Sequence, residues 1–481
     1  MRKNLLKVVA LFFVATMSVS AMAQTVALQE VKKDSAVYDS IERFTLENDW
    51  IRSAVAENYT VADLGGSALV RGMVAKEGKL YFAYRGGVGT HSIIVVNGAT
   101  GAYEKTITLS ENAFVKEINA GTDSASFVSA STLPNNDIKL DSEGNFLVGP
   151  CITSGAQNFQ IYKVDIETGA CTEIINEIIA ENPDTAIANK TVRFDAFGVY
   201  GDINGDAVIM AMNASAIDCW RWVIEDGEVQ GLGEYVMLDP LFEGSTDVNP
   251  GSAPQIMPIS ETMFYVDGNG TFPTLYQYEE GYGTRIDCFY NEEGEALPIL
   301  GSMNQGHNGI KDFIIEYANG ATEYFMLCAA TNTAKAPASS FALIKYADET
   351  LSFADAELIY QFPEAGFGAN SNAYRTAPVF ADVRSEAGEN GEAYVDIYVY
   401  VGENGMGKYT LTAEAPEYVQ PDAVENVTIS KVYTNGGLVV ADGEIEIFTV
   451  TGQNVTSQNG KLAQGAYIVR AANGATKVFV K

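Results

Sequence analysis

The sequence predicts an all-β protein, and three observations support this fold class. Apolar and polar residues alternate with a period of two along most of the chain, as in strands that bury one face. Val, Ile, Tyr and Phe are abundant in these runs, and 45 glycines punctuate them. Amphipathic helical patterns are scarce, and the best candidates for short helices are residues 45–56 and 172–180.

A strand–turn–strand unit recurs six times in the central region. Each unit has a short apolar strand, a tight turn that usually contains Gly, Asn or Asp, and a more apolar second strand. Equivalent apolar positions recur about every 60 residues, at Met73, Ile138, Val199, Ile256, Ile310 and Val379. Because this period holds about four strands, the units are typical of blades arranged around a channel, which predicts a β-propeller. We expect six blades, with seven as the alternative.

The stretch IYKVDIETGACTEI, residues 161–174, predicts the outer hairpin of a blade. Gly169 supplies a positive φ, and the side chains of Asp165 and Thr168 can accept hydrogen bonds from the amides of the turn. Similar Gly-containing turns occur at the same phase of other units, as in VNGATGAY and IEDGEV. Their recurrence at one phase carries more weight than any single turn.

Ring closure is the next expectation. The sixth unit has a third strand at residues 406–413, after which the chain leaves. We expect residues 53–64 to supply the missing fourth strand, because closure removes open sheet edges. The predicted propeller therefore spans residues 53–414, preceded by an N-terminal extension at residues 24–52.

The N-terminus predicts export. Residues 1–23 combine a basic start, a short apolar run and the small-x-small sequence Ala21-Met22-Ala23, as in a secretory signal peptide. No later apolar run approaches the roughly 20 residues that span a bilayer. We therefore expect a secreted protein without a transmembrane segment.

The C-terminal region predicts a small accessory domain. A polar linker at residues 415–424 precedes residues 425–481, whose strict alternation predicts a β-sandwich. The segments IEIFTVTGQNV and LAQGAYIVRAANGATKVFVK resemble the C-terminal sorting domain of type IX secretion cargo in Bacteroidetes. This resemblance implies recognition by that secretion machinery and a place on the outer-membrane surface or outside the cell. The alternative is a generic immunoglobulin-like domain on a periplasmic protein.

The central region is similar to secreted Bacteroidetes propellers of unknown function, which are loosely related to YVTN-type repeat propellers. The likeness depends on the turn pattern, so it implies the fold and no activity.

Charge and cysteine content limit the classes of function. The formal net charge of −32 argues against nucleic acid and anionic membrane surfaces, since both need a basic footprint. The five cysteines have no CxxC spacing, so neither a zinc site nor a redox dithiol is indicated. We expect free, buried thiols, with a Cys151–Cys171 disulfide as the alternative.

Candidate ligand-binding residues follow from the propeller geometry, because the starts of the inner strands converge on one mouth of the channel. Two further candidates lie in the loop after the second strand of the first unit. The full set is Arg71, Arg85, His91, Asn136, Arg193, His307, Asn308, Asn372 and Arg375. Guanidinium and amide donors suit an anionic or hydroxyl-rich ligand such as an acidic sugar. The alternative is that they pair with local carboxylates.

Two other features allow a functional and a structural interpretation. Asp202, Asn204 and Asp206 have the 1, 3, 5 spacing of a calcium loop, but Asn213 stands where a bidentate Glu is expected. The Asn204-Gly205 pair equally predicts a plain hairpin. Trp220 and Trp222 could stack on sugar rings or pack in the core.

No catalytic motif accompanies these residues. The chain has two histidines and lacks both Gly-x-Ser-x-Gly and His-Glu-x-x-His. The leading hypothesis is a monomeric, non-catalytic binding protein for a glycan or another polymer, with no cofactor except a possible calcium ion. The alternatives are an extracellular polysaccharide lyase or hydrolase and a scaffold for protein partners.

Overall fold

The computed structural model describes most of the chain, in two compact units, Met1–Ala415 and Pro416–Lys481. The described ranges are 28–33, 41–60, 63–121, 125–240, 250–268, 271–300, 303, 307–417, 433–435, 437–440, 445–449, 452–471 and 474–480. The all-β prediction is confirmed, since the α-helices in these ranges, α1 (Gly66–Leu69) and α2 (Thr185–Ala188), have four residues each. The predicted signal peptide lies outside the described residues.

The larger unit consists of six four-stranded antiparallel arrays. The first array contains β2 (Val70–Lys76), β3 (Lys79–Tyr84), β4 (Ser92–Asn97) and β5 (Tyr103–Thr108). The second contains β8 (Leu133–Leu140), β9 (Phe146–Cys151), β10 (Asn158–Val164) and β11 (Cys171–Ile178). The third contains β12 (Gly198–Gly201), β13 (Ala207–Met212), β14 (Asp218–Glu225) and β16 (Glu234–Leu238), with β15 (Glu228–Val229) paired to β14.

The other three arrays repeat this order. The fourth contains β17 (Gln255–Pro258), β18 (Met263–Gly268), β19 (Thr271–Glu279) and β20 (Tyr282–Asp287). The fifth contains β21 (Ile310–Glu316), β22 (Thr322–Ala329), β23 (Phe341–Lys345) and β24 (Glu357–Phe362). The sixth contains β25 (Val379–Val383), β26 (Ala393–Val401), β27 (Gly405–Ala413) and β1 (Phe44–Ser53). A parallel pairing of β16 with β20 joins the third and fourth arrays.

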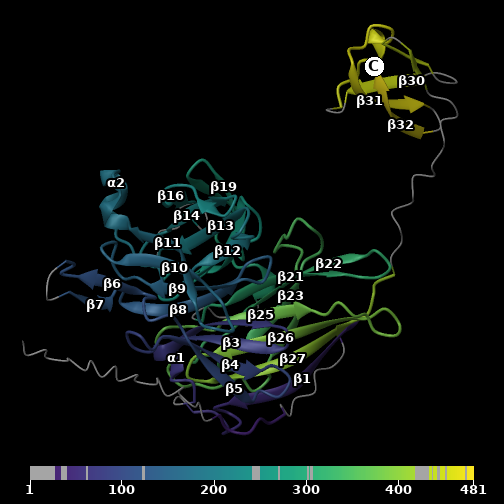
Figure 1. The fold of residues 1–481 in the computed structure, drawn as a ribbon. Coiled ribbons are helices and arrows are strands. Elements are labelled where there is room, and N and C mark those ends of the chain that lie inside the picture. Colours follow the sequence, from purple (N-terminus) through teal and green to yellow (C-terminus); the bar gives the residue numbers. More distant parts are fainter. Residues whose placement is uncertain are drawn as a thin grey trace, which may run out of the picture. The chain divides into compact units, whose positions relative to one another are not determined.

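The first strands of the arrays contact one another in a closed cycle. The order is β2, β8, β12, β17, β21, β25 and back to β2. Each neighbouring pair of arrays also shares one hydrophobic cluster. A ring of sheets with its cores between them fits a propeller-like fold (Figure 1).

The strand that completes the sixth array is β1, which is not the segment that the sequence predicted. β1 pairs with β27 from Phe44↔Ala413 to Ser53↔Gly405, and the two strands lie side by side in Figure 1. The expectation of residues 53–64 for this strand was therefore wrong, and so was the boundary that assigned residues 44–52 to an extension outside the propeller.

Two β-bulges explain why residues 45–56 and 172–180 looked helical. The register of β1 shifts between Asn48 and Trp50, so Trp50 and Ile51 are both buried. In β11, Glu173 and Ile175 face consecutive residues of β10, which leaves Ile174 as an extra residue. A bulge breaks the period of two, and the broken pattern imitates a helical one.

The outer turn between β10 and β11 has the predicted chemistry. The Asp165 carboxylate accepts from the amides of Glu167 at 2.9 Å and Thr168 at 3.2 Å. Gly169 has φ 75°, and its amide donates to the Asp165 carbonyl. A Cβ on Gly169 would lie 2.0 Å from the Thr108 carbonyl oxygen of the neighbouring array, so glycine also permits close packing there.

Short elements fill the connections of the larger unit. The hairpin of β6 (Val115–Ile118) and β7 (Ser126–Ser129) separates the first two arrays along the chain. The 3₁₀ turns η1 (Ile179–Glu181) and η2 (Pro298–Leu300) follow the second and fourth arrays. No helix in the described ranges is long and apolar enough to cross a bilayer.

All five cysteines are free. The alternative of a Cys151–Cys171 disulfide was wrong, because the strand register separates the two residues. Cys171 pairs with Val164, which lies level with Phe146 at the start of β9, whereas Cys151 ends that strand.

The C-terminal unit is also β-rich. The strands β28 (Tyr433–Asn435) and β29 (Leu438–Val440) form one sheet. The strands β30 (Ile445–Thr449), β31 (Gly465–Ala471) and β32 (Gly474–Val480) form another, with the turn η3 (Thr456–Gln458) between β30 and β31. Val439, Ile447 and Val469 belong to one small hydrophobic core.

Candidate functional site

The starts of the inner strands bring several of the predicted residues to one end of the larger unit. Arg71 is the second residue of β2, Asn136 lies in the first half of β8, and Arg193 precedes β12. A gap of about 10 Å³ lies between Arg71, Asn136, Asp195 and Thr376, among other residues. Such a gap has room for about one water molecule. We call this end of the channel the mouth.

Asp195 is the centre of the mouth, and the sequence analysis did not single it out. Its buried carboxylate accepts two hydrogen bonds from Arg193, from Nε at 2.9 Å and from Nη2 at 3.0 Å. The Ala253 amide donates to the same carboxylate at 2.9 Å and the Cys151 thiol at 2.8 Å. Burial, together with this carboxylate, raises the pKa of Cys151 well above its usual value, so the thiol stays protonated.

Arg71 is the most deeply buried arginine of the mouth. Its side chain is 4% exposed, and Nη1 lies 3.9 Å from Asp195 Oδ1. Its guanidinium carbon lies 3.6 Å from the centre of the Tyr374 ring, which is a cation–π geometry. Burial lowers the pKa of Arg71, while Cys151 and Asp195 act in the opposite direction.

Tyr374 links a third arginine, Arg85, to this group. The sequence analysis did not single out Tyr374. Its phenol interacts electrostatically with Arg71, Arg85 and Arg193. The Arg85 guanidinium donates to the Ala68 carbonyl, and burial lowers its pKa. We call Arg71, Arg85, Arg193, Asp195 and Tyr374 the mouth cluster. It contains three guanidinium groups and one carboxylate.

A polar pocket of about 350 Å³ is lined by other predicted residues, including His307, Asn372 and Arg375, together with Asn332 and Ser371. The segment that carries Asn372 and Arg375 also carries Tyr374. Within it, the Asn372 side-chain amide donates to the Thr376 carbonyl at 2.9 Å, and the Arg375 amide donates to the Asn372 carbonyl at 3.0 Å. The chain therefore connects the polar pocket directly to the mouth cluster.

His307 is buried in the wall of this pocket. Burial first, and the charge of Arg375 second, lower the pKa of His307 to about 4. The imidazole is therefore neutral at neutral pH, with one donor and one acceptor nitrogen. The neighbouring Asn308 side chain donates to the carbonyls of Ser252 at 2.7 Å and Ala253 at 2.9 Å. It thereby ties this wall to the backbone that contacts Asp195.

His91 has a supporting position. Its Nδ1 hydrogen-bonds to the Arg85 carbonyl, and its ring meets the edge of Phe114 at a centroid distance of 5.8 Å. Burial lowers the pKa of His91. His91 thus fixes the loop that carries Arg85.

Several buried polar atoms at this end have no hydrogen-bond partner among the described residues. They are Arg85 Nη1, His91 Nε2, Asn135 Oδ1, His307 Nδ1, Asn308 Oδ1 and Asn372 Oδ1. Buried polar groups normally find partners, so each of these atoms indicates a position for water or a ligand.

The two tryptophans do not belong to this site. Trp220 and Trp222 are 0% and 1% exposed. Both pack against Phe194, and the Trp222 indole donates to Glu177 at 2.7 Å. The interpretation of these rings as sugar-stacking surfaces was wrong, because the period of two buries them together in the core between the second and third arrays.

The candidate calcium residues form the turn between β12 and β13. Asp202 Oδ1 accepts from the Asn204 amide at 2.9 Å, and Asp206 Oδ1 accepts from the Asp226 amide at 3.1 Å. Lys163 Nζ donates to Asn204 Oδ1 at 2.6 Å. Within the described ranges, no group of three His, Cys, Asp or Glu side chains could hold a metal ion. Calcium binding here remains a prediction, and it would have to displace Lys163.

Comparisons with known proteins concern the fold. No family model and no curated protein matches the sequence. Among solved structures, a DUF4623 family protein from Bacteroides eggerthii has a TM-score of 0.53 at 15% identity, over 80% of this chain and 78% of that one. A protein of unknown function from Dyadobacter fermentans has a TM-score of 0.40 at 12% identity, over 80% of this chain and 100% of that one. At such identities, fold similarity carries no information about activity.

Proposed function

We propose that this protein is a secreted or cell-surface binding protein that recognises an anionic, hydroxyl-rich ligand, such as an acidic glycan, at the mouth. The six arrays act as the blades of a propeller that presents this site, and residues 425–481 form a β-sandwich that directs export. The observation that carries the proposal is the excess of guanidinium groups in the mouth cluster of a chain with net charge −32.

Charge balance supports an anionic ligand. The one carboxylate of the mouth cluster is already occupied by Arg193, Cys151 and Ala253. Arg71 and Arg85 therefore add positive charge that Asp195 alone does not balance, and Arg375 adds more beside the polar pocket. Guanidinium groups bind carboxylates and sulfates through paired hydrogen bonds, which favours ligands with planar or multiple anionic oxygens.

Binding without catalysis is favoured by the absence of a suitable acid–base pair in the mouth cluster. Glycoside hydrolysis typically uses two carboxylates on opposite sides of the scissile bond. Two carboxylates border the gap at the mouth, but Asp195 is buried beneath its partners and Asp137 is 4% exposed and pairs with Lys139. A lyase or hydrolase remains the second candidate because the Tyr374 phenol lies among three arginines, where a hydroxyl could exchange a proton with a sugar.

The test is a thermal-shift comparison on the full chain. Oligogalacturonates should raise the melting temperature by mass action, and neutral xylo-oligosaccharides of equal length should not. Arg375→Ala and Arg85→Ala should reduce the response to the acidic series. Arg384→Ala is the matched control, because that guanidinium pairs with Asp396 on another strand and lines neither the mouth nor the polar pocket.

Two results would count against binding at the mouth. One is an equal response to neutral and acidic oligosaccharides. The other is a response to acidic oligosaccharides that survives both Arg85→Ala and Arg375→Ala. Release of unsaturated or shortened products from the acidic series would replace the binding role with the lyase or hydrolase.

A further inference from the structure

A separate cavity occupies the channel beyond the mouth. It has a volume of about 130 Å³, and the inner strands or their flanking residues from all six arrays contribute to its wall. None of the candidate ligand-binding residues predicted from the sequence lines it. The gap of about 10 Å³ at the mouth is bordered by Arg71, Asn136 and Gln255. Of the residues that line the gap and the cavity, the two spaces share Gln255 alone, so we treat them as distinct sites.

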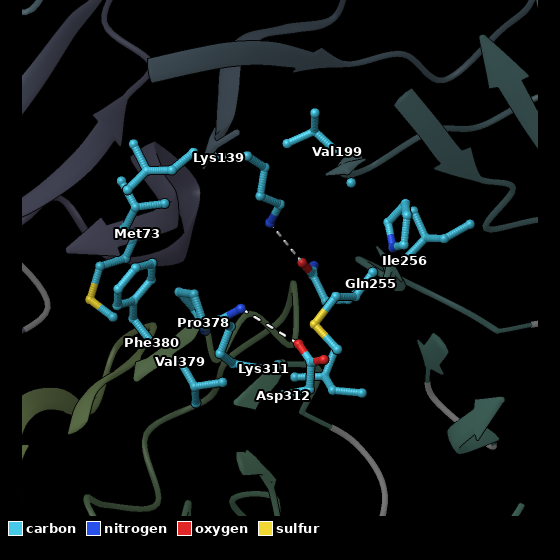
Figure 2. A pocket seen from close by; sticks show the side chains of 17 residues that line it. Met73, Lys139, Val199, Gln255, Ile256, Lys311, Asp312, Pro378, Val379 and Phe380 are labelled. Atoms are coloured by element: carbon cyan, nitrogen blue, oxygen red, sulfur yellow. Dashed lines mark hydrogen bonds and ion pairs between the residues drawn. The ribbon is translucent and has the colours of Figure 1, made fainter. Parts of the chain in front are cut away.

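Much of the cavity wall is apolar. Met73, Ile256 and Val379 are almost fully buried, and Phe380 and Val199 complete this surface. In Figure 2, Met73 and Phe380 lie on one side of the opening and Ile256 on the other. A cavity of roughly 150 Å³ with apolar walls takes up benzene in an engineered protein, so this one can hold a body of about four to six carbon atoms.

The polar part of the wall contains the ammonium groups of two lysines, Lys139 and Lys311. Lys139 Nζ lies 3.0 Å from Asp137 and 3.3 Å from Gln255 Oε1, as Figure 2 shows for the second contact. Lys311 Nζ lies 3.5 Å from Asp312. Each ammonium has three N–H groups. Lys139 has three acceptors in range, because Asp137 Oδ1 also lies 3.2 Å from its Nζ, and an incoming anion would take the place of the neutral Gln255 amide oxygen. Lys311 keeps about two donors for a ligand.

The carboxylates of the wall are less available. Asp137 is 4% exposed and also accepts from the amides of Ile138 and Phe197. Asp312 is 30% exposed and pairs with Lys311. An incoming anion can use the remaining ammonium donors, whereas an incoming cation would have to compete with Lys311 for Asp312.

We propose that the channel cavity binds a small organic carboxylate, with its carboxylate between Lys139 and Lys311 and its apolar body against Met73, Ile256 and Phe380. This site is independent of the proposed function at the mouth. The chain would then bind two ligands of different size, a polymer at the mouth and a small acid in the channel cavity.

The experiment compares three probes that differ only in their polar group, namely valerate, 1-pentanol and pentylammonium, on the full chain. Isothermal titration calorimetry and thermal shift should show saturable binding of valerate and little response to the other two. Equal binding of pentanol would overturn the role of the lysines. Preferential binding of pentylammonium, or no binding of any probe, would overturn the carboxylate assignment.

Variants locate the binding. Lys311→Met should weaken valerate binding at least about tenfold by removing a charged donor. Lys105→Met is the control, because that lysine forms an exposed ion pair with Glu167. Val199→Phe, which fills the cavity, should also abolish binding and serves as the second test if Lys311→Met does not fold. Unchanged valerate affinity in both variants would overturn the site.

Arg375→Ala separates this proposal from the function proposed at the mouth. The valerate response should survive this variant, while the response to oligogalacturonate falls. Loss of the valerate response in Arg375→Ala would place the acid in the polar pocket and overturn the channel site.

Discussion

Asp195 determines the charge balance of the mouth cluster. Its carboxylate is buried and is held by two hydrogen bonds from Arg193, with Arg71 Nη1 at 3.9 Å. Asp195→Asn should destabilise the folded chain by about 3 kcal/mol, because it leaves buried guanidinium charge without its partner. Chemical denaturation measures the change.

The control for Asp195 is Glu167→Gln. Glu167 is 80% exposed and pairs with Lys105 at 3.6 Å, so its loss should change stability by less than about 1 kcal/mol. If the two variants proved equally stable, Asp195 would have no structural role in holding the arginines.

His307 makes a prediction about pH. Its folded pKa, about 4, lies below the unfolded value near 6.5, so the unfolded chain binds a proton first as the pH falls. The free energy of unfolding therefore falls between about pH 6.5 and pH 4 because of His307. Below about pH 4 this histidine causes no further change. The full effect is about 3 kcal/mol. His307→Gln should remove this component from the stability profile.

Direct titration checks the same pKa. The chain has two histidines, so one variant assigns both imidazole signals in an NMR titration. His307 should remain neutral down to about pH 4. Protonation near pH 6.5 would show that its environment is more polar than the buried wall described above.

At the scale of single residues, sequence analysis selected side chains that the structure brings to one end of the larger unit, but it did not reveal how they contact one another. Aligning the starts of the units was enough to select Arg71, Arg193 and Asn308, because the repeat places them at one end. Asp195 was missed although it follows Arg193 by two residues, since an Arg-x-Asp pair in an acidic chain is not distinctive. Lys139 and Lys311 were missed because they lie within strands, and the sequence does not reveal which side chains reach the channel.

Among the elements, close approach of inner strands depends on glycines. A Cβ on Gly72 would lie 2.6 Å from the Ile138 amide nitrogen, one on Gly198 2.3 Å from the Ile256 carbonyl oxygen, and one on Gly309 1.7 Å from the Ala377 carbonyl oxygen. These contacts join the first array to the second, the third to the fourth and the fifth to the sixth. Glycine therefore permits close approach at three of the junctions in the ring.

Gly198→Ala tests this pairing. The added methyl group meets backbone, which cannot move aside as a side chain would, so the variant should lose about 1–3 kcal/mol. Gly87→Ala is the control, because its nearest atom is Thr90 Oγ1 at 3.5 Å. Equal stability of the two variants would mean that the third and fourth arrays can separate slightly without loss.

The elements also show where sequence patterns lose information. The strands with a regular period of two were predicted with the correct type, and the Asp165 turn with its correct hydrogen bonds. The strands β1 and β11 were misread because each contains a bulge, which shifts the buried face by one residue. A bulge depends on the partner strand, so one segment read alone does not contain the signal.

For the whole molecule, the strands that close the ring all belong to the larger unit, and the C-terminal unit supplies none of them. The two compact units are Met1–Ala415 and Pro416–Lys481, and each has its own hydrophobic clusters. A chain ending at residue 415 should therefore keep the melting temperature of the larger unit within about 2 °C, a shift that corresponds to roughly 1.5 kcal/mol at this size.

Removing residues 41–53 should have the opposite effect. This deletion takes away β1 and with it Phe44, Leu46 and Ile51, which belong to the cluster between the fifth and sixth arrays. It also exposes the edge of β27, an open template for pairing with another chain. We expect loss of the cooperative transition and aggregation, measured by calorimetry and light scattering. If the deleted chain instead melted cooperatively at the original temperature, β1 would contribute nothing to the stability of the ring, and β25, β26 and β27 would be enough to form the sixth array. The first-strand cycle would then be sufficient to hold the larger unit together.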